Sequence, residues 1–158
     1  MLTKAQKSTT IRLCIMTNDF QKVQPDQLET GYELPPLSYN LDAEVIAKYL
    51  EAVGESSSLY WQSDNRQALT GLVPPLAITT YAMTLLLQRL SLPPGSIHVT
   101  QEIEFLKEVR VGTTITCHAR VSQNWKRGKF HLLTIDLSIL DQSKEPVQSG
   151  KVGFILPS

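Results

Sequence analysis

The sequence predicts a single α+β domain in which one long apolar helix is wrapped by a curved antiparallel sheet. Two observations carry this prediction. The segment from about Pro74 to Leu90 has the composition of a buried helix, and four segments after Gly95 alternate apolar and polar residues as strands do. The chain has 158 residues, of which 42% are hydrophobic and 19% charged, and this suits one globular domain.

The central helix is predicted from its opening, its composition and its end. Pro74 and Pro75 open it, because a proline in the first turn of a helix loses no hydrogen bond. From there to Leu90 only Arg89 carries a charge, and apolar residues occur on every side. We therefore expect this helix to be buried all round. The sequence Pro93–Gly95 ends it.

The strands are predicted from period-two alternation. The apolar positions are Ile97, Val99, Ile103 and Phe105 in the first segment; Ile115, Cys117, Ala119 and Val121 in the second; Leu133, Ile135, Leu137 and Ile139 in the third; and Val152, Phe154 and Leu156 in the fourth. Turn-forming residues separate these segments. Each strand is thus expected to pack one face and to expose the other to water or to a partner.

The part before the central helix contains shorter elements. We expect a strand near Pro36–Tyr39, and then an amphipathic helix that Asp42 caps and Gly54 ends. Residues 1–27 are interpreted as an N-terminal extension and residues 28–158 as the domain. Thr10–Met16 is either an accessory strand or part of a flexible arm.

These elements complement one another, because a buried helix needs a surface around it and one-sided strands need something to wrap. One helix followed by four long antiparallel strands, with one strand before it, is the arrangement of the hot-dog fold. The alternative is a split α+β sandwich of the cystatin or scytalone-dehydratase type, in which the helices precede the whole sheet.

Charge and cysteine content exclude several classes of function. Lys plus Arg and Asp plus Glu both number 15, so no field of one sign favours nucleic acid or an anionic membrane as a partner. Cys14 and Cys117 are far apart and make neither a disulfide scaffold nor a metal site. We expect no cofactor. The N-terminus lacks the features of a secretory signal and no apolar run is long enough to span a membrane, so a cytoplasmic location is expected.

Short segments in a fixed order carry a resemblance to a known family. They are Gly31–Pro36, Ala52–Glu55, Gly71–Pro75, His98–Phe105 and Arg110–Thr113. With them the chain resembles the MaoC-type dehydratases, in particular their N-terminal-half variety, from about Leu28 to Pro157. The resemblance implies the hot-dog fold and the reversible addition of water to a trans-2-enoyl thioester carried on CoA or on acyl carrier protein.

The resemblance also implies where the catalytic groups are. The family uses an Asp and a His five residues apart as general acid and base. In this sequence Glu55 stands at the Asp position and Tyr60 at the His position. A tyrosine, with a pKa near ~10, shuttles protons poorly at neutral pH. The resemblance therefore implies a degenerate subunit. Two-subunit dehydratases of mycolate synthesis pair such a subunit with a catalytic one, so we expect a homodimer or a heterodimer with a catalytic hot-dog subunit.

Two further groups of residues are candidates for substrate binding. Gly71, Leu72 and Val73 precede the central helix, where the family places a backbone N–H that polarises the thioester carbonyl. The alternative is a loop that merely turns the chain. Lys126 and Arg127 stand at a predicted hairpin tip, with Trp125 and Lys129, where cations meet CoA phosphates or an acidic carrier protein. Here the alternative is a solvated turn.

Other functions remain open at this stage. His98, His118 and His131 are all placed on the polar faces of strands, as surface residues and not as a base or metal ligands. A hot-dog thioesterase would use Glu55 or Asp64 to activate water against the thioester. A non-catalytic acyl-binding or regulatory module is the third interpretation.

Overall fold

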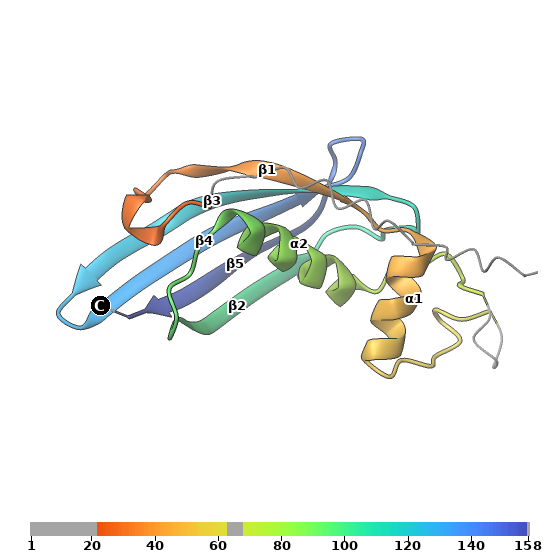
Figure 1. The fold of residues 1–158 in the computed structure, drawn as a ribbon. Helices are drawn as coiled ribbons and strands as arrows, with labels where there is room; N and C mark the ends of the chain where they lie inside the picture. The colour runs from red at the N-terminus through yellow and green to blue at the C-terminus, as the bar shows by residue number, and fades with distance from the viewer. Residues whose placement is uncertain (1–21, 63–67, 158) are drawn as a thin grey trace, which may run out of the picture.

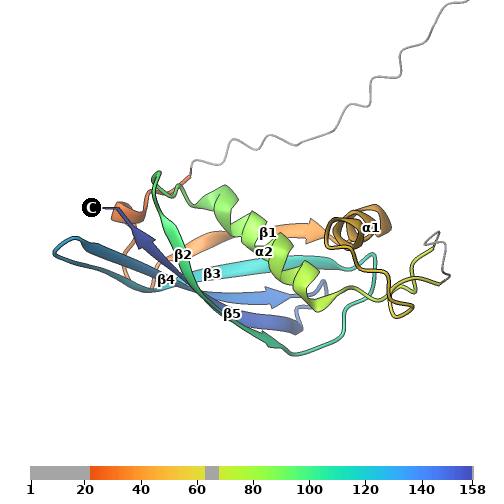
Figure 2. The same cartoon turned by 90° about the horizontal axis from the view of Figure 1, so that it is seen from below.

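The long helix lies on one face of a five-stranded antiparallel sheet in the computed structural model, which describes residues 22–62 and 68–157 (Figures 1 and 2). The elements in chain order are the 3₁₀ turn η1 (Pro25–Gln27), strand β1 (Glu33–Asn40), helices α1 (Ala43–Ala52) and α2 (Pro75–Arg89), and strands β2 (Ile97–Phe105), β3 (Thr114–Arg127), β4 (Phe130–Leu140) and β5 (Pro146–Leu156). The strand order is β1-β3-β4-β5-β2. This is the hot-dog arrangement, and the predicted fold class is confirmed.

The core lies between α2 and the facing side of the three middle strands. Their inward side chains alternate along each strand as predicted, and the fully buried ones include Ile115, Val121, Leu133, Ile135 and Val152. The helix contributes Ala77 and Ala82, whose small side chains let its backbone approach the sheet, together with the buried Leu85 and Leu86. The packing of one helix on one sheet layer therefore forms most of the core.

The expectation that α2 is buried all round is wrong. On the side of the helix away from the sheet, Leu76 is 54% exposed and Leu87 is 39% exposed, and Thr84 between them is also exposed. The physical reason is that a single sheet layer covers only one side of a helix. The helix has 15 residues, and none of the helices in residues 22–62 and 68–157 is long and apolar enough to cross a membrane.

Helix α1 begins and ends as the sequence predicts. The Asp42 side chain accepts a hydrogen bond from the Val45 amide at 2.9 Å. At the other end Gly54 adopts a positive φ of 71°, and the amides of Gly54 and Glu55 donate to the carbonyls of Glu51 and Leu50. This is the hydrogen-bond pattern of a Schellman cap, which favours glycine. The cap fixes the direction in which the chain leaves α1, and therefore the position of Glu55.

The two edges of the sheet differ. Strand β1 carries Pro35 and Pro36 and has an irregular register between Leu34 and Leu37, features that hinder the addition of another strand. Strand β2 also has an irregular register, between His98 and Thr100, but it contains no proline, and all its residues except the half-buried Ile103 are exposed. The expectation that this strand packs one face is wrong, because it lies at the margin of the sheet beyond the helix. The β2 edge is therefore open to a further strand.

The last residues of the predicted N-terminal extension are packed on the domain. Val23 forms a parallel bridge with Leu90, and Pro25 is buried. The Asn124 side-chain amide donates to the carbonyls of Pro25 and Leu28 at 2.8 and 2.6 Å. Residues 22–27 thus contact the end of α2 and the β3–β4 hairpin. Thr10–Met16 lies outside the described residues.

We predict that the sheet–helix core dominates the stability of the fold. Leu133→Ala removes a side chain with no exposed surface and should lower the free energy of unfolding by about 2–5 kcal/mol. Leu76→Ala is the matched control, because Leu76 is 54% exposed and its loss should cost less than about 1 kcal/mol. Urea unfolding of both variants measures the difference, and equal costs would contradict the described packing.

Candidate functional site

An open groove of about 420 Å³ lies where the N-terminal end of α2 meets the loop after α1 and the end of β2. We call it the α2 groove. Its lining is mainly apolar and comprises Leu59, Tyr60, Leu72, Val73, Pro75, Ile78 and residues 105–109. Loop, helix and strand thus bring together three segments that are distant in the sequence, around the end of α2 that faces α1 (Figure 1).

Glu55 and Tyr60, which the resemblance places at the positions of the family's acid and base, have different surroundings. Tyr60 lines the α2 groove. The Glu55 carboxylate accepts a hydrogen bond from the Ser57 amide at 2.7 Å, and the Glu55 carbonyl accepts one from the Trp61 indole N–H at 3.0 Å. Glu55 therefore stabilises its own loop. The structure shows no hydrogen bond between the side chains of Glu55 and Tyr60, although both residues are described.

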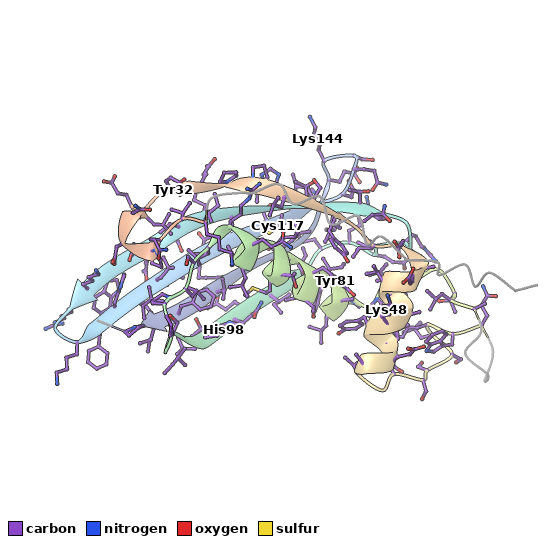
Figure 3. All side chains as sticks on the ribbon, in the orientation of Figure 1. Tyr32, Lys48, Tyr81, His98, Cys117 and Lys144 are labelled. Carbon is purple, nitrogen blue, oxygen red and sulfur yellow. The ribbon has the colours of Figure 1, made fainter. Side chains whose placement is uncertain are left out.

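Three other tyrosines lie on β1, α1 and α2. The ring of Tyr81 stacks on that of Tyr39 with centroids 4.9 Å apart, and its hydroxyl donates to the Val45 carbonyl at 3.1 Å (Figure 3). Burial raises the pKa of Tyr81, and it also raises that of Tyr49, which a hydrogen bond with Thr80 partly opposes. Both phenols thus stay neutral at neutral pH and are not bases.

The predicted oxyanion loop has a defined hydrogen-bond pattern. The Val73 amide donates to the Val109 carbonyl at 3.0 Å, and the Gly71 carbonyl accepts from the Val111 amide at 2.8 Å. The Val73 amide is therefore already occupied, which corrects its place among the candidate donors. The Leu72 amide makes only a long contact of 3.4 Å with the Thr70 hydroxyl.

A donor that the sequence did not indicate directly lies three residues after Val73. Pro75 is the first residue of α2 and has no N–H, so the first amide that the helix can offer belongs to Leu76. This amide stands at the positive end of the helix dipole. The pair of prolines was the signal in the sequence that could have indicated this donor. Neither proline has an N–H, so the first free amide belongs to the helix and not to the loop.

Lys126 and Arg127 lie far from the α2 groove, at the tip of the β3–β4 hairpin. The Lys126 ammonium is 2.6 Å from the Asp26 carboxylate and lowers the pKa of that carboxyl. Arg127 lies directly opposite Phe130 in the sheet, and its side chain is on the opposite face from that of Lys126. The structure therefore separates these two cations from each other and from the residues of the groove.

The histidines are placed only in part as expected. His98 and His118 are exposed, but His131 is 3% exposed and points inward, which corrects the prediction. His131 shares its strand parity with Leu133 and Ile135, and this decides its face. Its Nε2 donates to the Asn124 side-chain oxygen at 2.6 Å, since the Asn124 amide nitrogen already donates to two carbonyls. Burial lowers the pKa of His131.

Neither a metal centre nor the second carboxylate of the thioesterase interpretation can be assigned. Within residues 22–62 and 68–157, no three His, Cys, Asp or Glu side chains are grouped so that they could hold a metal ion. Asp64 and Cys14 lie outside the described residues.

Comparison with known proteins places this geometry in a family. Residues 29–149 match the family model described as the FAS1-like dehydratase domain region. No curated protein matches the chain significantly.

Solved structures share the fold at low sequence identity. The (R)-hydratase from A. caviae involved in PHA biosynthesis has a TM-score of 0.67 and 22% identity, over 83% of this chain and 98% of that one. A MaoC-like dehydratase from Rhodospirillum rubrum has a TM-score of 0.65 and 19% identity, over 84% and 94%. The truncated HadBC complex, a (3R)-hydroxyacyl-ACP dehydratase from Mycobacterium tuberculosis, has a TM-score of 0.63 and 15% identity, over 80% and 96%.

We predict that Cys117 is inert as a nucleophile in the folded protein. It lies between the sheet and α2 (Figure 3), is 4% exposed, and burial raises the pKa of its thiol to about 12. Because the thiolate is the reactive form, iodoacetamide at pH 8 should modify Cys117 in a Cys14→Ser variant only after unfolding in urea. Rapid modification of the folded variant, measured by mass spectrometry, would contradict this.

Proposed function

The chain belongs to the family of FAS1-like dehydratase regions, and from this membership we propose that it is a subunit of an enoyl-thioester hydratase or dehydratase that needs a catalytic partner. One observation carries the proposal. Tyr60, which the resemblance places at the position of the family's histidine, lines the α2 groove, while the Glu55 carboxylate accepts a hydrogen bond from the Ser57 amide.

The reaction makes a clear demand on the site. Hydration adds the oxygen of water to C3 of the trans-2-enoyl thioester and a proton to C2, and the water loses a proton to a base. The groups that move these protons work best when their pKa is near the working pH. The resemblance places a tyrosine where the family uses a histidine, so the chemistry is assigned to the partner subunit.

The α2 groove suits the binding of an acyl thioester. The exposed side chains of Leu59 and Phe105 offer an apolar surface for the acyl chain. The Leu76 amide, at the positive end of the α2 dipole, is a donor for the thioester carbonyl. We assign to this subunit the binding of substrate and to its partner the acid–base groups.

The open edge of β2 supports the proposed association. Its backbone is free of proline, and Val99 and Phe105 are 41% and 50% exposed, so an unpaired edge of this kind favours strand addition. A partner of the same fold, related by a two-fold axis, would place its own β2 antiparallel to this one. HadBC, which shares the fold, was solved as a complex. A heterodimer with a catalytic hot-dog subunit is therefore proposed, with the homodimer as the alternative.

We predict little or no hydratase activity of the chain alone. Loss of a well-tuned acid–base group removes about 10²–10⁴-fold in rate. Tyr60→Phe should therefore leave the small residual hydration of trans-2-enoyl-CoA within about twofold. The control Tyr32→Phe should do the same, because Tyr32 is exposed and lies at the end of the sheet away from α1 (Figure 3). The decrease in enoyl absorbance measures the rate. Robust activity that disappears in Tyr60→Phe alone would make Tyr60 a catalytic acid and overturn the proposal. Thioester hydrolysis without hydration would favour the thioesterase.

We further predict that the β2 edge carries the association. Val99→Lys should convert the dimer into a monomer, because a lysine on an edge strand opposes pairing. Val53→Lys, at the C-cap of α1, is the matched control, since Val53 is 57% exposed and lies away from this edge, and it should leave the mass unchanged. Sedimentation of the chain, alone and mixed with a catalytic hot-dog subunit, measures the state. A wild-type chain that stays monomeric in both samples would contradict the proposed association.

A further inference from the structure

A buried glutamine connects helix α2 to the sheet behind the α2 groove. Gln148 on β5 is 1% exposed, and its Nε2 donates a hydrogen bond to the Thr79 hydroxyl on α2 at 2.6 Å. Its Oε1 is also buried and has no hydrogen-bond partner within residues 22–62 and 68–157. An unpaired buried polar atom destabilises a fold, so the packing of the core does not by itself account for a glutamine here. We call Gln148 and Thr79 the polar pair.

The strand register places the polar pair at the inner end of the α2 groove. Gln148 lies directly opposite Phe105, which lines the groove. Directly opposed residues share a face of the sheet, so both side chains are on the side of α2. On the helix, Thr79 follows Ile78, which also lines the groove. The polar pair therefore stands where the groove stops.

A small cavity of about 10 Å³ lies directly beyond the polar pair. The pair lines it together with Ala82, three residues further along α2, and Ile103, two residues before Phe105 on β2. The buried Leu137 and Ile139 on β4 line it as well. The cavity thus continues the direction of the groove between α2 and the sheet, and the polar pair separates the two spaces.

An acyl chain bound in the α2 groove would run toward the polar pair. Its thioester carbonyl is expected at the Leu76 amide, at the start of α2. Thr79 lies three residues further along the helix, which corresponds to a rise of about 4.5 Å. A chain of only a few carbon atoms therefore reaches the polar pair.

Both space and polarity oppose a longer chain at this point. A cavity of about 10 Å³ is close to the size of one water molecule and does not hold several methylene groups. An alkyl chain pressed against Gln148 would also keep its Oε1 away from water without offering a hydrogen-bond donor.

We infer that the polar pair ends the α2 groove and restricts this subunit to short acyl chains, an inference that rests on the proposed function and names its substrate class. The volume of the Gln148 side chain fills the passage between α2 and β5. The hydrogen bond to Thr79 holds the side chain in that passage. Gln148 is thus a specificity-determining residue.

The test compares the binding of butyryl-CoA and decanoyl-CoA to the full chain by titration calorimetry. Both thioesters are saturated, so neither can be hydrated during the measurement. Each methylene group that enters an apolar site strengthens binding by about fourfold. The wild-type chain should bind the two with Kd values within about threefold, because the additional carbon atoms find no site. In Gln148→Ala, which joins the cavity to the groove, decanoyl-CoA should gain at least about tenfold relative to butyryl-CoA.

Two further variants serve as controls. Gln88→Ala makes the same change at an exposed position of α2 and should leave the ratio of the two Kd values within about twofold. Gln148→Leu keeps the passage filled and removes the unpaired oxygen, so it should fold stably and keep the ratio of the wild type. Urea unfolding checks that each variant is folded.

Each outcome decides the inference. A wild-type chain that binds decanoyl-CoA at least about tenfold more tightly than butyryl-CoA overturns it, whether or not Gln148→Ala folds. An unchanged ratio in folded Gln148→Ala, or an equal gain in Gln148→Leu, also overturns it, because the volume of the side chain would then not be the limit. The proposed function stands in these cases, since both thioesters bind. Binding of neither thioester overturns the proposed function and this inference with it.

Discussion

The packing of α2 on a single layer of antiparallel strands is the constraint on which the rest of this structure depends. The small residues Ala77 and Ala82 let the helix lie close to the sheet, and the inward side chains of β3, β4 and β5 complete the core. A single layer, however, covers one side of a helix and leaves two sheet edges. The exposed Leu76 and Leu87 and the open β2 edge are direct consequences. A protomer built in this way has surfaces that favour association.

The same packing positions the α2 groove. The two prolines at the start of α2 fix the helix origin against the Val109–Val111 segment, through the hydrogen bonds of Gly71 and Val73. The Schellman cap at Gly54 fixes the loop that carries Tyr60 into the groove. A helix start and a helix end thus create a groove between elements that are far apart in the sequence.

The sequence by itself determined the helices, the strands and the fold class, because local periodicity and the capping residues Asp42 and Gly54 encode them. It also predicted that a phenol stands where a proton shuttle is needed. Tertiary structure alone decided the exposure and the hydrogen bonds of particular residues. It left α2 half exposed, buried His131, and bonded the Val73 amide so that Leu76 offers the next donor. The physical reason is that burial and hydrogen-bond occupancy depend on which distant segments meet, and alternation along one strand does not reveal which edge of the sheet that strand will occupy.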